Sequence, residues 1–207
     1  MEKFLSLPVE KQNTIIDAAL KCFGTNGYKK TSVSEIASNA GISKAMVFHY
    51  FGTKKALYIY LIELSSDLIM NEIYEKFDKT ITDFFDRIII SGNIKVSVMK
   101  KHPAIFLFLT NVYFETDEEV KKDIQNIFVK GEVFRNKIAF DGTDTSKFKT
   151  GIDSKLVMKM LVWLAEGYTS ELSNKINTEA DFDELFKEYY ECVNLIKNNF
   201  YKEEYIK

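Results

Sequence analysis

The chain has 207 residues, of which 46% are hydrophobic and 28% are charged, and its net charge is −2. This balance is typical of a globular protein and excludes a disordered or fibrous chain, and the length allows one large domain or two small ones. The longest apolar runs are far too short to cross a bilayer, so no association with a membrane is expected.

The start of the chain and its cysteines indicate a cellular compartment. No basic region leads into an apolar stretch after Met1, so no signal peptide is expected. The two cysteines, Cys22 and Cys192, lie far apart and not at a metal-ligand spacing. We therefore expect a reduced, cytoplasmic protein without a metal or another cofactor.

The charges are unevenly distributed along the chain. Residues 1–62 contain eight lysines and four acidic residues, a net charge of +4, so the remainder carries −6. A basic N-terminal part on an acidic body suggests that only the N-terminal part meets a polyanion, although a chance scatter of lysines is the alternative.

Two prolines and nine glycines are few for this length, which favours long helices. A first helix is predicted over residues 9–25, beginning after Pro8, with Gly27 placed to end it in a left-handed conformation. Ser32 followed three residues later by Glu35 is a capping box, which predicts the start of a second, short helix.

Gly41 is predicted to end this second helix, and Ser43 is a good N-cap for a third helix that reaches to about Tyr50. Gly52 then breaks the chain again. Thr53 is predicted to cap a long fourth helix.

The rest of the chain keeps a helical pattern with clear stops. Thr116 and Glu119 form another capping box, which predicts a helix that runs to about Phe140, and residues 141–152 are the clearest loop. The other helices are predicted over residues 82–101, 104–114, 153–176 and 181–201. Nothing alternates at period two for long enough to predict a sheet, so an all-α fold with about nine helices is expected.

The segment from Thr31 to Lys55 fits a helix-turn-helix, a motif that lays its second helix in the major groove of DNA. Ala37 is small where the two helices approach each other, and Gly41 supplies the turn. Phe48 is expected in the core, because proteins that bind duplex DNA rarely need an aromatic platform. Four apolar residues are expected to join these helices to the first one: Ile36, Ile42, Val47 and Phe51.

The run from Ile15 to Leu57, about a fifth of the chain, resembles the DNA-binding domain of the tetracycline-repressor (TetR) family. The matching pieces are, in order, Ala18-Ala19 with Phe23, Gly27-Tyr28, Thr31 with Ile36-Ala37, Ala40-Gly41-Ile42-Ser43, and Tyr50-Phe51 with Lys54 and Leu57. The resemblance implies a three-helix DNA-binding domain over residues 1–52. It implies a helical ligand-binding and dimerisation domain over residues 53–207.

The resemblance also implies which residues contact double-stranded DNA. Four of them would face base edges or nearby phosphates: Lys44, Ala45, Met46 and His49. Three would contact the DNA backbone: Thr31, Tyr50 and Lys54. The hydroxyls of Ser32 and Ser43 complete this predicted DNA surface. The family often has Gly or Pro and then Thr where this chain has Ala45-Met46, so the operator sequence does not carry over from relatives.

The body is rich in bulky aromatic and sulfur-containing residues, which suit the walls of a pocket for an apolar or aromatic ligand. The alternative is that these residues simply pack in the core, as such residues usually do. The resemblance implies a ligand cavity between the central helices. The predicted ligand contacts are Phe106, Thr110, Tyr113, Phe128, Trp163 and Glu166.

The resemblance implies a homodimer, because the last two helices pair as a four-helix bundle in this family. Apolar residues recur there at intervals of three and four, although they also suit the core of a monomer. A two-fold dimer would require a near-palindromic operator. The predicted interface residues are Leu156, Met160, Leu164, Phe182, Leu185, Phe186, Tyr189, Val193 and Ile196.

The expected function is therefore that of a transcriptional regulator, a repressor whose operator affinity is controlled by a small, largely apolar or aromatic ligand; a corepressor role for the ligand stays open. An enzyme is one alternative, but His49 and His102 are the only histidines, and no phosphate-binding loop or nucleophile motif occurs, so no enzymatic activity is expected. A second alternative is a DNA-binding protein whose body binds a protein partner and no ligand.

Overall fold

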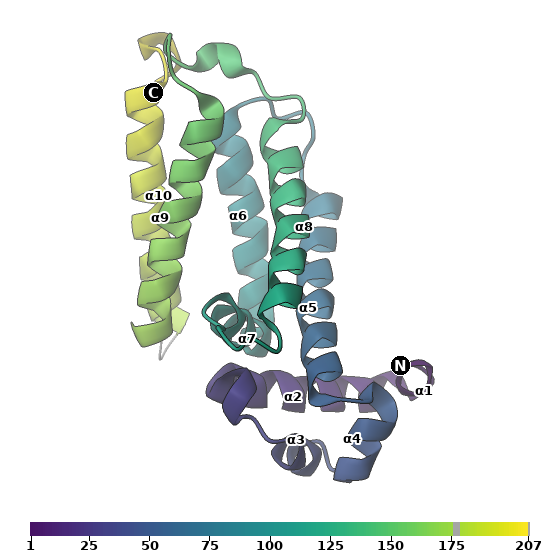
Figure 1. Cartoon of the computed structure of the whole chain (residues 1–207). Coiled ribbons are helices and arrows are strands. Elements are labelled where there is room, and N and C mark those ends of the chain that lie inside the picture. The colour runs from purple at the N-terminus through teal and green to yellow at the C-terminus, as the bar shows by residue number, and fades with distance from the viewer. Residues whose placement is uncertain (176–178, 207) are drawn as a thin grey trace. The chain divides into compact units, whose positions relative to one another are not determined.

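The structure is a computed structural model that describes the backbone of residues 1–175 and 179–206 and the side chains of residues 1–171 and 186–206. Over these residues the chain is all-α, as predicted, and Figure 1 shows the order of its helices. The helices are α1 (Glu2–Leu5), α2 (Val9–Lys30), α3 (Val33–Asn39), α4 (Lys44–Phe51), α5 (Lys54–Lys76), α6 (Phe84–Lys101), α7 (Pro103–Tyr113), α8 (Lys121–Phe140), α9 (Ser154–Lys175) and α10 (Glu179–Phe200).

The first helix, α1, was not predicted, and it raises the number of helices in the described part of the chain to ten. Its Phe4 side chain is fully buried, with its ring centroid 4.7 Å from that of Phe51 and 5.8 Å from that of Tyr60. The side-chain amide of Gln12 donates to the carbonyl of Leu7 at 2.9 Å and holds the connection to α2. A single helical turn is too short to show a periodic pattern, and it depends on contacts such as these for its stability.

The three predicted N-caps of the N-terminal helices are confirmed. The Ser32 hydroxyl accepts a hydrogen bond from the Glu35 amide at 3.1 Å, and the Ser43 hydroxyl accepts one from the Met46 amide at 3.2 Å. Thr53 caps α5 in the same way. These caps satisfy amides that have no partner within the helix, and they fix where α3, α4 and α5 begin.

The predicted capping box at Thr116 and Glu119 is wrong, because α8 begins only at Lys121. Carboxylates take the cap positions instead. Glu115 accepts from the amides of Thr116 and Asp117, both at 2.9 Å, and Asp117 accepts from the Glu119 amide at 3.0 Å. An ionised carboxylate accepts stronger hydrogen bonds than a hydroxyl, so these turns replace the first turn of the expected helix.

The chain forms two compact units: the first consists of Met1–Glu72 and Ser97–Val133, and the second of Ile73–Val96 and Phe134–Lys207. These units are not the two functional domains that the sequence predicts, which meet between residues 52 and 53. That division of function stays a prediction. No described helix has an apolar stretch that would reach across a membrane. Within the same residues, no group of His, Cys, Asp and Glu side chains is arranged to hold a metal ion.

Within the first unit, α2 and α7 approach each other closely. A Cβ atom at Gly24 of α2 would lie 3.0 Å from the backbone nitrogen of Phe108 in α7, so only glycine allows this distance. The side-chain amide of Asn111 donates to the Gly24 carbonyl, and the Glu115 carboxylate accepts from the Tyr28 amide at 3.0 Å. Backbone packing and two long-range hydrogen bonds thus join α2 to α7 and to the residues that follow it.

The second unit has its own core at the end where α6 and α9 begin and α10 ends. Asp83 precedes α6 and is held by three groups: the ammonium of Lys147 at 2.9 Å, that of Lys197 at 3.5 Å, and the hydroxyl of Tyr201 at 3.3 Å. Burial alone would raise the pKa of Asp83, but the hydrogen bond from Lys147 and the nearby positive charges outweigh it and lower that pKa.

Candidate nucleic-acid interface

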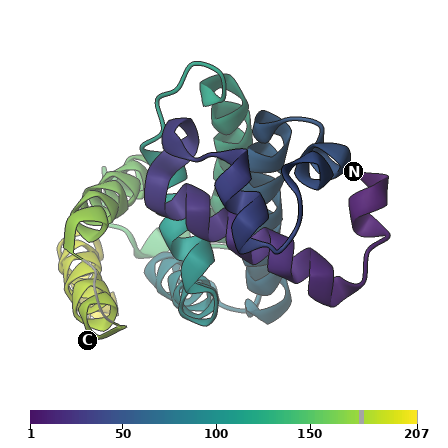
Figure 2. The same ribbon diagram turned by 90° about the horizontal axis from the view of Figure 1, so that it is seen from below.

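Two glycines set the bounds of α4, the second helix of the helix-turn-helix. Gly41 has a φ of 66° in the turn after α3, and Gly52 has a φ of 77° at the end of α4. Both values lie in the left-handed region that other residues disfavour. Figure 2, which views the chain from below, shows α3 and α4 in front of α2, so the short helices lie on one side of the first unit.

The side chains of α4 divide into a buried and an exposed face. Val47 and Phe51 are buried, Phe51 with its ring against Phe4 of α1, whereas Lys44, Ala45 and His49 are exposed and Met46 is half-buried. Four predicted base or phosphate contacts therefore reach the surface together, on the helix that the motif assigns to the major groove. Their contact with DNA stays a prediction.

The expectation for Phe48 is wrong: its side chain is 40% exposed and lies outside the core. Phe48 follows Ala45 by three residues and Lys44 by four, so it lies beside these exposed residues one helical turn further along α4. The second helix of the motif, α4, thus presents an aromatic side chain to solvent.

Two of the predicted DNA-backbone contacts are buried. Thr31 is 2% exposed, and its hydroxyl donates to the carbonyls of Gly27 at 2.7 Å and Cys22 at 3.1 Å, so the hydroxyl stabilises the end of α2 and is not free for a phosphate. Tyr50 is 4% exposed and its ring lies 6.1 Å from that of Phe4. Interior packing, which a local motif does not specify, explains both placements.

Lys54 is also engaged within the protein. Its ammonium donates to the carbonyls of Tyr28 at 3.0 Å and Thr31 at 3.4 Å, and it lies 4.4 Å from the centroid of the Tyr28 ring. A cation at the C-terminal end of a helix interacts favourably with the helix dipole. The other two predicted DNA contacts, Ser32 and Ser43, are exposed. Their hydroxyls accept the capping hydrogen bonds of α3 and α4.

The predicted ligand contacts fall in both units. The first unit contains Phe106, Thr110, Tyr113 and Phe128, of which Tyr113 and Phe128 lie together with their ring centroids 5.9 Å apart. The second unit contains Trp163, which is exposed beneath the Lys159 ammonium, and the half-buried Glu166. Whether these residues contact a ligand stays a prediction.

The predicted dimer contacts of the second unit are partly exposed. Leu156 and Met160 are exposed on α9, together with Trp163. Val193 is fully buried in the unit's own core, so that it packs within the chain and not against a partner. Three further predicted contacts are half-buried: Leu164, Tyr189 and Ile196. Phe186 is half-buried as well, whereas the side chains of Phe182 and Leu185 lie outside the described residues.

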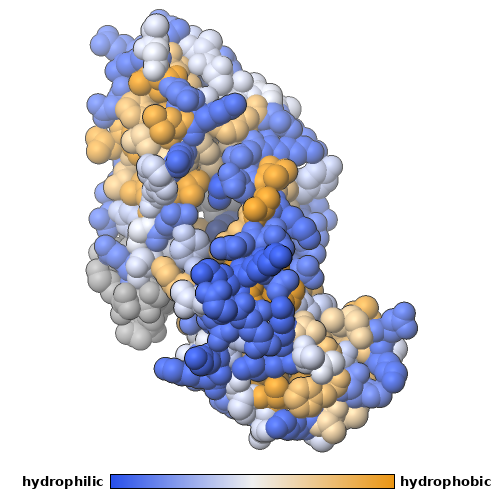
Figure 3. All heavy atoms as spheres, in the orientation of Figure 1, coloured by the Kyte–Doolittle hydropathy of each residue, from blue (hydrophilic) through white to orange (hydrophobic). Residues whose placement is uncertain are grey.

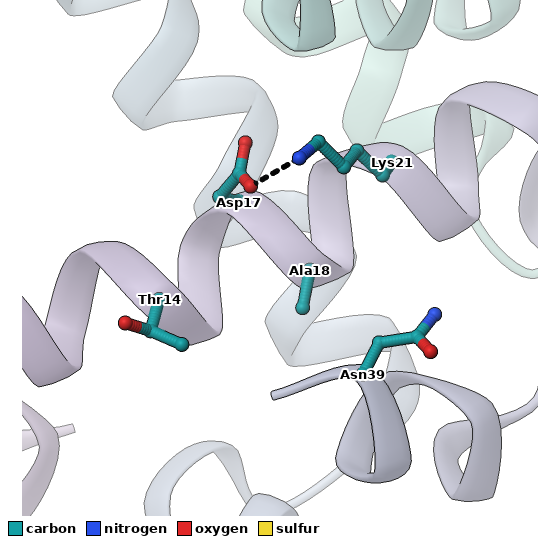
Figure 4. Close-up of a pocket in the computed structure, with 5 residues that line it drawn as sticks. All are labelled: Thr14, Asp17, Ala18, Lys21 and Asn39. Carbon is teal, nitrogen blue, oxygen red and sulfur yellow. Dashed lines mark ion pairs between the residues drawn. The ribbon is translucent and has the colours of Figure 1, made fainter. Parts of the chain in front are cut away.

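A depression of about 340 Å³ lies between α2 and α3, and Figure 4 shows the residues around it. Its only cation, Lys21, is paired with Asp17 one helical turn away at 2.6 Å, and the rest of the lining is neutral: Thr14, Ala18 and Asn39. The site therefore has no uncompensated charge with which to bind an ion.

Comparison with known proteins agrees with this geometry. Residues 15–61 match the family described as bacterial regulatory proteins, tetR family. The chain is 41% identical to the uncharacterized HTH-type transcriptional regulator YuxN of Bacillus subtilis over 64 residues, which are 31% of this chain and 22% of that regulator. The chain therefore matches less than a quarter of that relative's length. It is 22% identical to the HTH-type transcriptional repressor AcnR of Corynebacterium efficiens over 83% of this chain and 87% of the repressor.

A solved structure extends the likeness to the whole fold. The transcriptional regulator FadR from Bacillus subtilis, in complex with stearoyl-CoA, superposes with a TM-score of 0.68 at 19% identity and covers 88% of this chain and 96% of that one. At this identity the likeness concerns the fold: a helix-turn-helix followed by a helical body.

Proposed function

Because the chain belongs to the TetR family of bacterial regulatory proteins, we propose that it is a transcriptional repressor that binds an operator in DNA and releases it when a small ligand binds. The observation that carries the proposal is the exposed face of α4. Lys44, Ala45 and His49 point to solvent there, while Val47 and Phe51 anchor the helix from behind. An exposed, firmly anchored helix of this kind can enter the major groove without rearranging the core.

The chemistry of this face suits a DNA groove. The Lys44 ammonium can donate to guanine O6 and N7 or to a phosphate, and the Met46 side chain can contact a thymine methyl group. The exposed Lys29 and Lys30 lie at the end of α2 and add positive charge to the same unit. Positive charge supplies the part of the affinity that depends on salt, whereas the residues of α4 supply the sequence preference.

The exposed apolar residues of α9 and α10 support a homodimer. Leu156, Met160 and Trp163 recur on α9 at intervals of four and three, and Leu195 adds to them on α10. Figure 3 shows hydrophobic side chains gathered over this side of the second unit. A single chain gains nothing from exposing such a row, whereas a second copy would bury it and place two α4 helices on a near-palindromic site.

The joint between α2 and α7 supports control by a ligand. The DNA-binding helices are tied to α7 through Glu115 and Asn111, so that a shift of α7 changes the position of α2. An allosteric coupling free energy of about 1–3 kcal/mol would change the affinity for DNA roughly 5- to 150-fold. The stearoyl-CoA in the B. subtilis FadR structure is an example of a ligand with a long apolar chain on this fold.

The experiment that tests this function is binding of the purified protein to the DNA upstream of its own gene, and to a random duplex pool, at several salt concentrations. Lys44→Ala is compared with the wild type and with Lys130→Ala, which removes an exposed lysine of α8. We expect one near-palindromic site to be bound, weaker binding by Lys44→Ala with a salt slope reduced by about 1, and no change in the control. Failure of both DNA sources to show a preferred site would overturn the proposal.

A further inference from the structure

The exposed residues of α4 form one stripe along the helix, and its centre is apolar. These residues are Lys44, Ala45, Phe48 and His49. Each residue of an α-helix is rotated by about 100° from the one before it, so Ala45 and Phe48 lie about 60° apart on the helix surface. Lys44 lies to one side of this pair and His49 to the other. The two polar side chains therefore form the edges of the stripe.

The exposure of Phe48 follows from the way in which α4 is held. On the buried side of the helix, the ring of Phe51 lies 4.7 Å from that of Phe4, centroid to centroid, and Val47 is buried as well. The Gly52 amide donates to the Phe48 carbonyl at 2.8 Å and closes the last turn. A rotation of α4 that buried Phe48 would bring Val47 and Phe51 to the surface, so the anchored helix keeps the Phe48 ring in solvent.

The centre of this stripe can distinguish base pairs only through apolar contact. The side chains of Ala45 and Phe48 have no hydrogen-bond donor or acceptor. No carboxylate occurs in α4, so the helix has no acceptor of the kind that binds the amino group of cytosine. The apolar group that a base presents in the major groove is the methyl group of thymine. A phenyl ring can contact this methyl group while the base stays stacked in the duplex.

We propose that Phe48 is a specificity-determining residue that contacts a thymine methyl group in each half-site of the operator. Lys44 and His49, at the edges of the stripe, are then placed to donate to neighbouring bases or phosphates. The aromatic ring offers a large apolar contact area and has few rotamers to restrict. This inference rests on the proposed binding of a near-palindromic operator and names the feature of the DNA that α4 reads.

The test replaces thymine by uracil in the bound DNA. Deoxyuridine pairs with adenine as thymidine does and differs from it only in lacking the methyl group. The site that the wild-type protein selects from a random duplex pool is synthesised again with deoxyuridine at one thymine position at a time, and affinities are measured by fluorescence anisotropy. We expect one position in each half-site at which this change weakens binding about threefold to fourfold, the factor that corresponds to one buried methylene-sized group.

Substitutions at position 48 connect this effect to the residue. Phe48→Ala should bind the thymine site more weakly than the wild type and should bind the uracil site equally well, whereas Phe48→Leu should keep part of the thymine preference. Lys44→Ala should weaken binding to both sites and leave their ratio unchanged. Tyr74→Ala, which removes an exposed aromatic ring of α5, is the matched control and should change neither affinity. Thermal unfolding should show a melting temperature close to that of the wild type for Phe48→Ala, because the ring lies outside the core.

Two results would overturn the inference: equal binding of thymine and uracil at every position by the wild type, or an unchanged thymine preference in Phe48→Ala. The selection experiment separates these results from a failure of the proposed function. If a site is selected but its affinity does not depend on methyl groups, only the inference fails. If no DNA site is selected, the repressor proposal fails and the inference fails with it.

Discussion

The Lys54 ammonium closes the end of α2: it lies 3.0 Å from the Tyr28 carbonyl oxygen and 4.4 Å from the centroid of the Tyr28 ring. One side chain thereby compensates the carbonyls that the helix leaves without partners and also covers an aromatic face. Since Lys54 is the first residue of α5, the contact joins the beginning of α5 to the end of α2.

Lys54→Ala is therefore expected to act on stability and not on DNA contact. The loss of hydrogen bonds from a charged donor should lower the free energy of unfolding by about 1.5–3 kcal/mol. The salt dependence of DNA binding should keep its slope, because the ammonium is already engaged. Urea denaturation and a salt titration of DNA affinity measure the two effects. A slope reduced by about 1 with unchanged stability would instead show that Lys54 contacts a phosphate, as the family resemblance implies.

Phe4→Ala is expected to weaken DNA binding through the position of α4. Its fully buried ring packs on Phe51 and near Tyr50, so its removal leaves a cavity under the DNA-binding helix and should cost about 3–5 kcal/mol of stability. Phe4→Leu, which refills most of the volume, should recover most of the loss. Leu5→Ala is the control, since Leu5 is exposed. Thermal unfolding and DNA affinity are measured together; equal effects of the substitutions at positions 4 and 5 would contradict this role.

The second unit should lose stability in acid through Asp83. Its pKa is lowered in the folded protein, so its contribution is present above the ordinary pKa of an aspartate and is lost as the pH falls through the lowered value. The pKa of Lys147 is raised, mainly by its hydrogen bond with Asp83, and this contribution disappears only at strongly alkaline pH. At neutral pH both contributions are therefore present.

Asp83→Asn should lower the free energy of unfolding at neutral pH by about 2 kcal/mol, because it leaves two lysine ammoniums facing a neutral amide. The variant should also show a smaller loss of stability between neutral pH and about pH 3 than the wild type. Urea denaturation across this range measures both. Parallel stability curves for the two proteins would exclude Asp83 as a source of the acid sensitivity.

Leu156→Glu combined with Met160→Glu should separate the proposed dimer. The two substitutions place charges in the exposed apolar row of α9, where burial against a second copy would cost several kcal/mol, and they leave the core of the monomer untouched. Sedimentation velocity should show a monomer, and the affinity for a two-half-site operator should fall by more than about tenfold. Lys155→Glu, at an exposed position beside the row, is the matched control. If the double variant is still a dimer, the dimer interface does not include this row of α9.

Local signals predicted the helix-turn-helix well. Ser32 and Ser43 cap their helices as expected, and Gly41 adopts the left-handed conformation that the turn requires, because caps and turns depend on residues close in sequence. Thr116 shows the limit of the same logic. It was expected to cap a helix together with Glu119, but the Glu119 amide donates to the carboxylate of Asp117, and the amide of Thr116 itself donates to that of Glu115.

Features that depend on distant partners could not be predicted in this way. Thr31 and Lys54 are polar residues of the expected surface, but both bond to carbonyls at the end of α2. Tyr190 lies beside Gly92, although the two residues are almost a hundred positions apart in the sequence, and no local pattern in either helix predicts this contact. Residue type therefore predicted which elements form, whereas the pairing of elements decided which side chains are free to bind.

The close approach at Gly24 limits how far α2 and α7 can move relative to each other. Glycine within a helix costs about 1 kcal/mol relative to alanine, and here it allows the backbone of α7 to lie directly against α2. The space that a side chain at position 24 would occupy is taken by the Phe108 backbone nitrogen, 3.0 Å from such a Cβ atom, and by the Leu107 side chain, 3.1 Å from it. The two helices therefore have little room to shift past each other at this point, and a displacement of α7 is expected to move α2 with it.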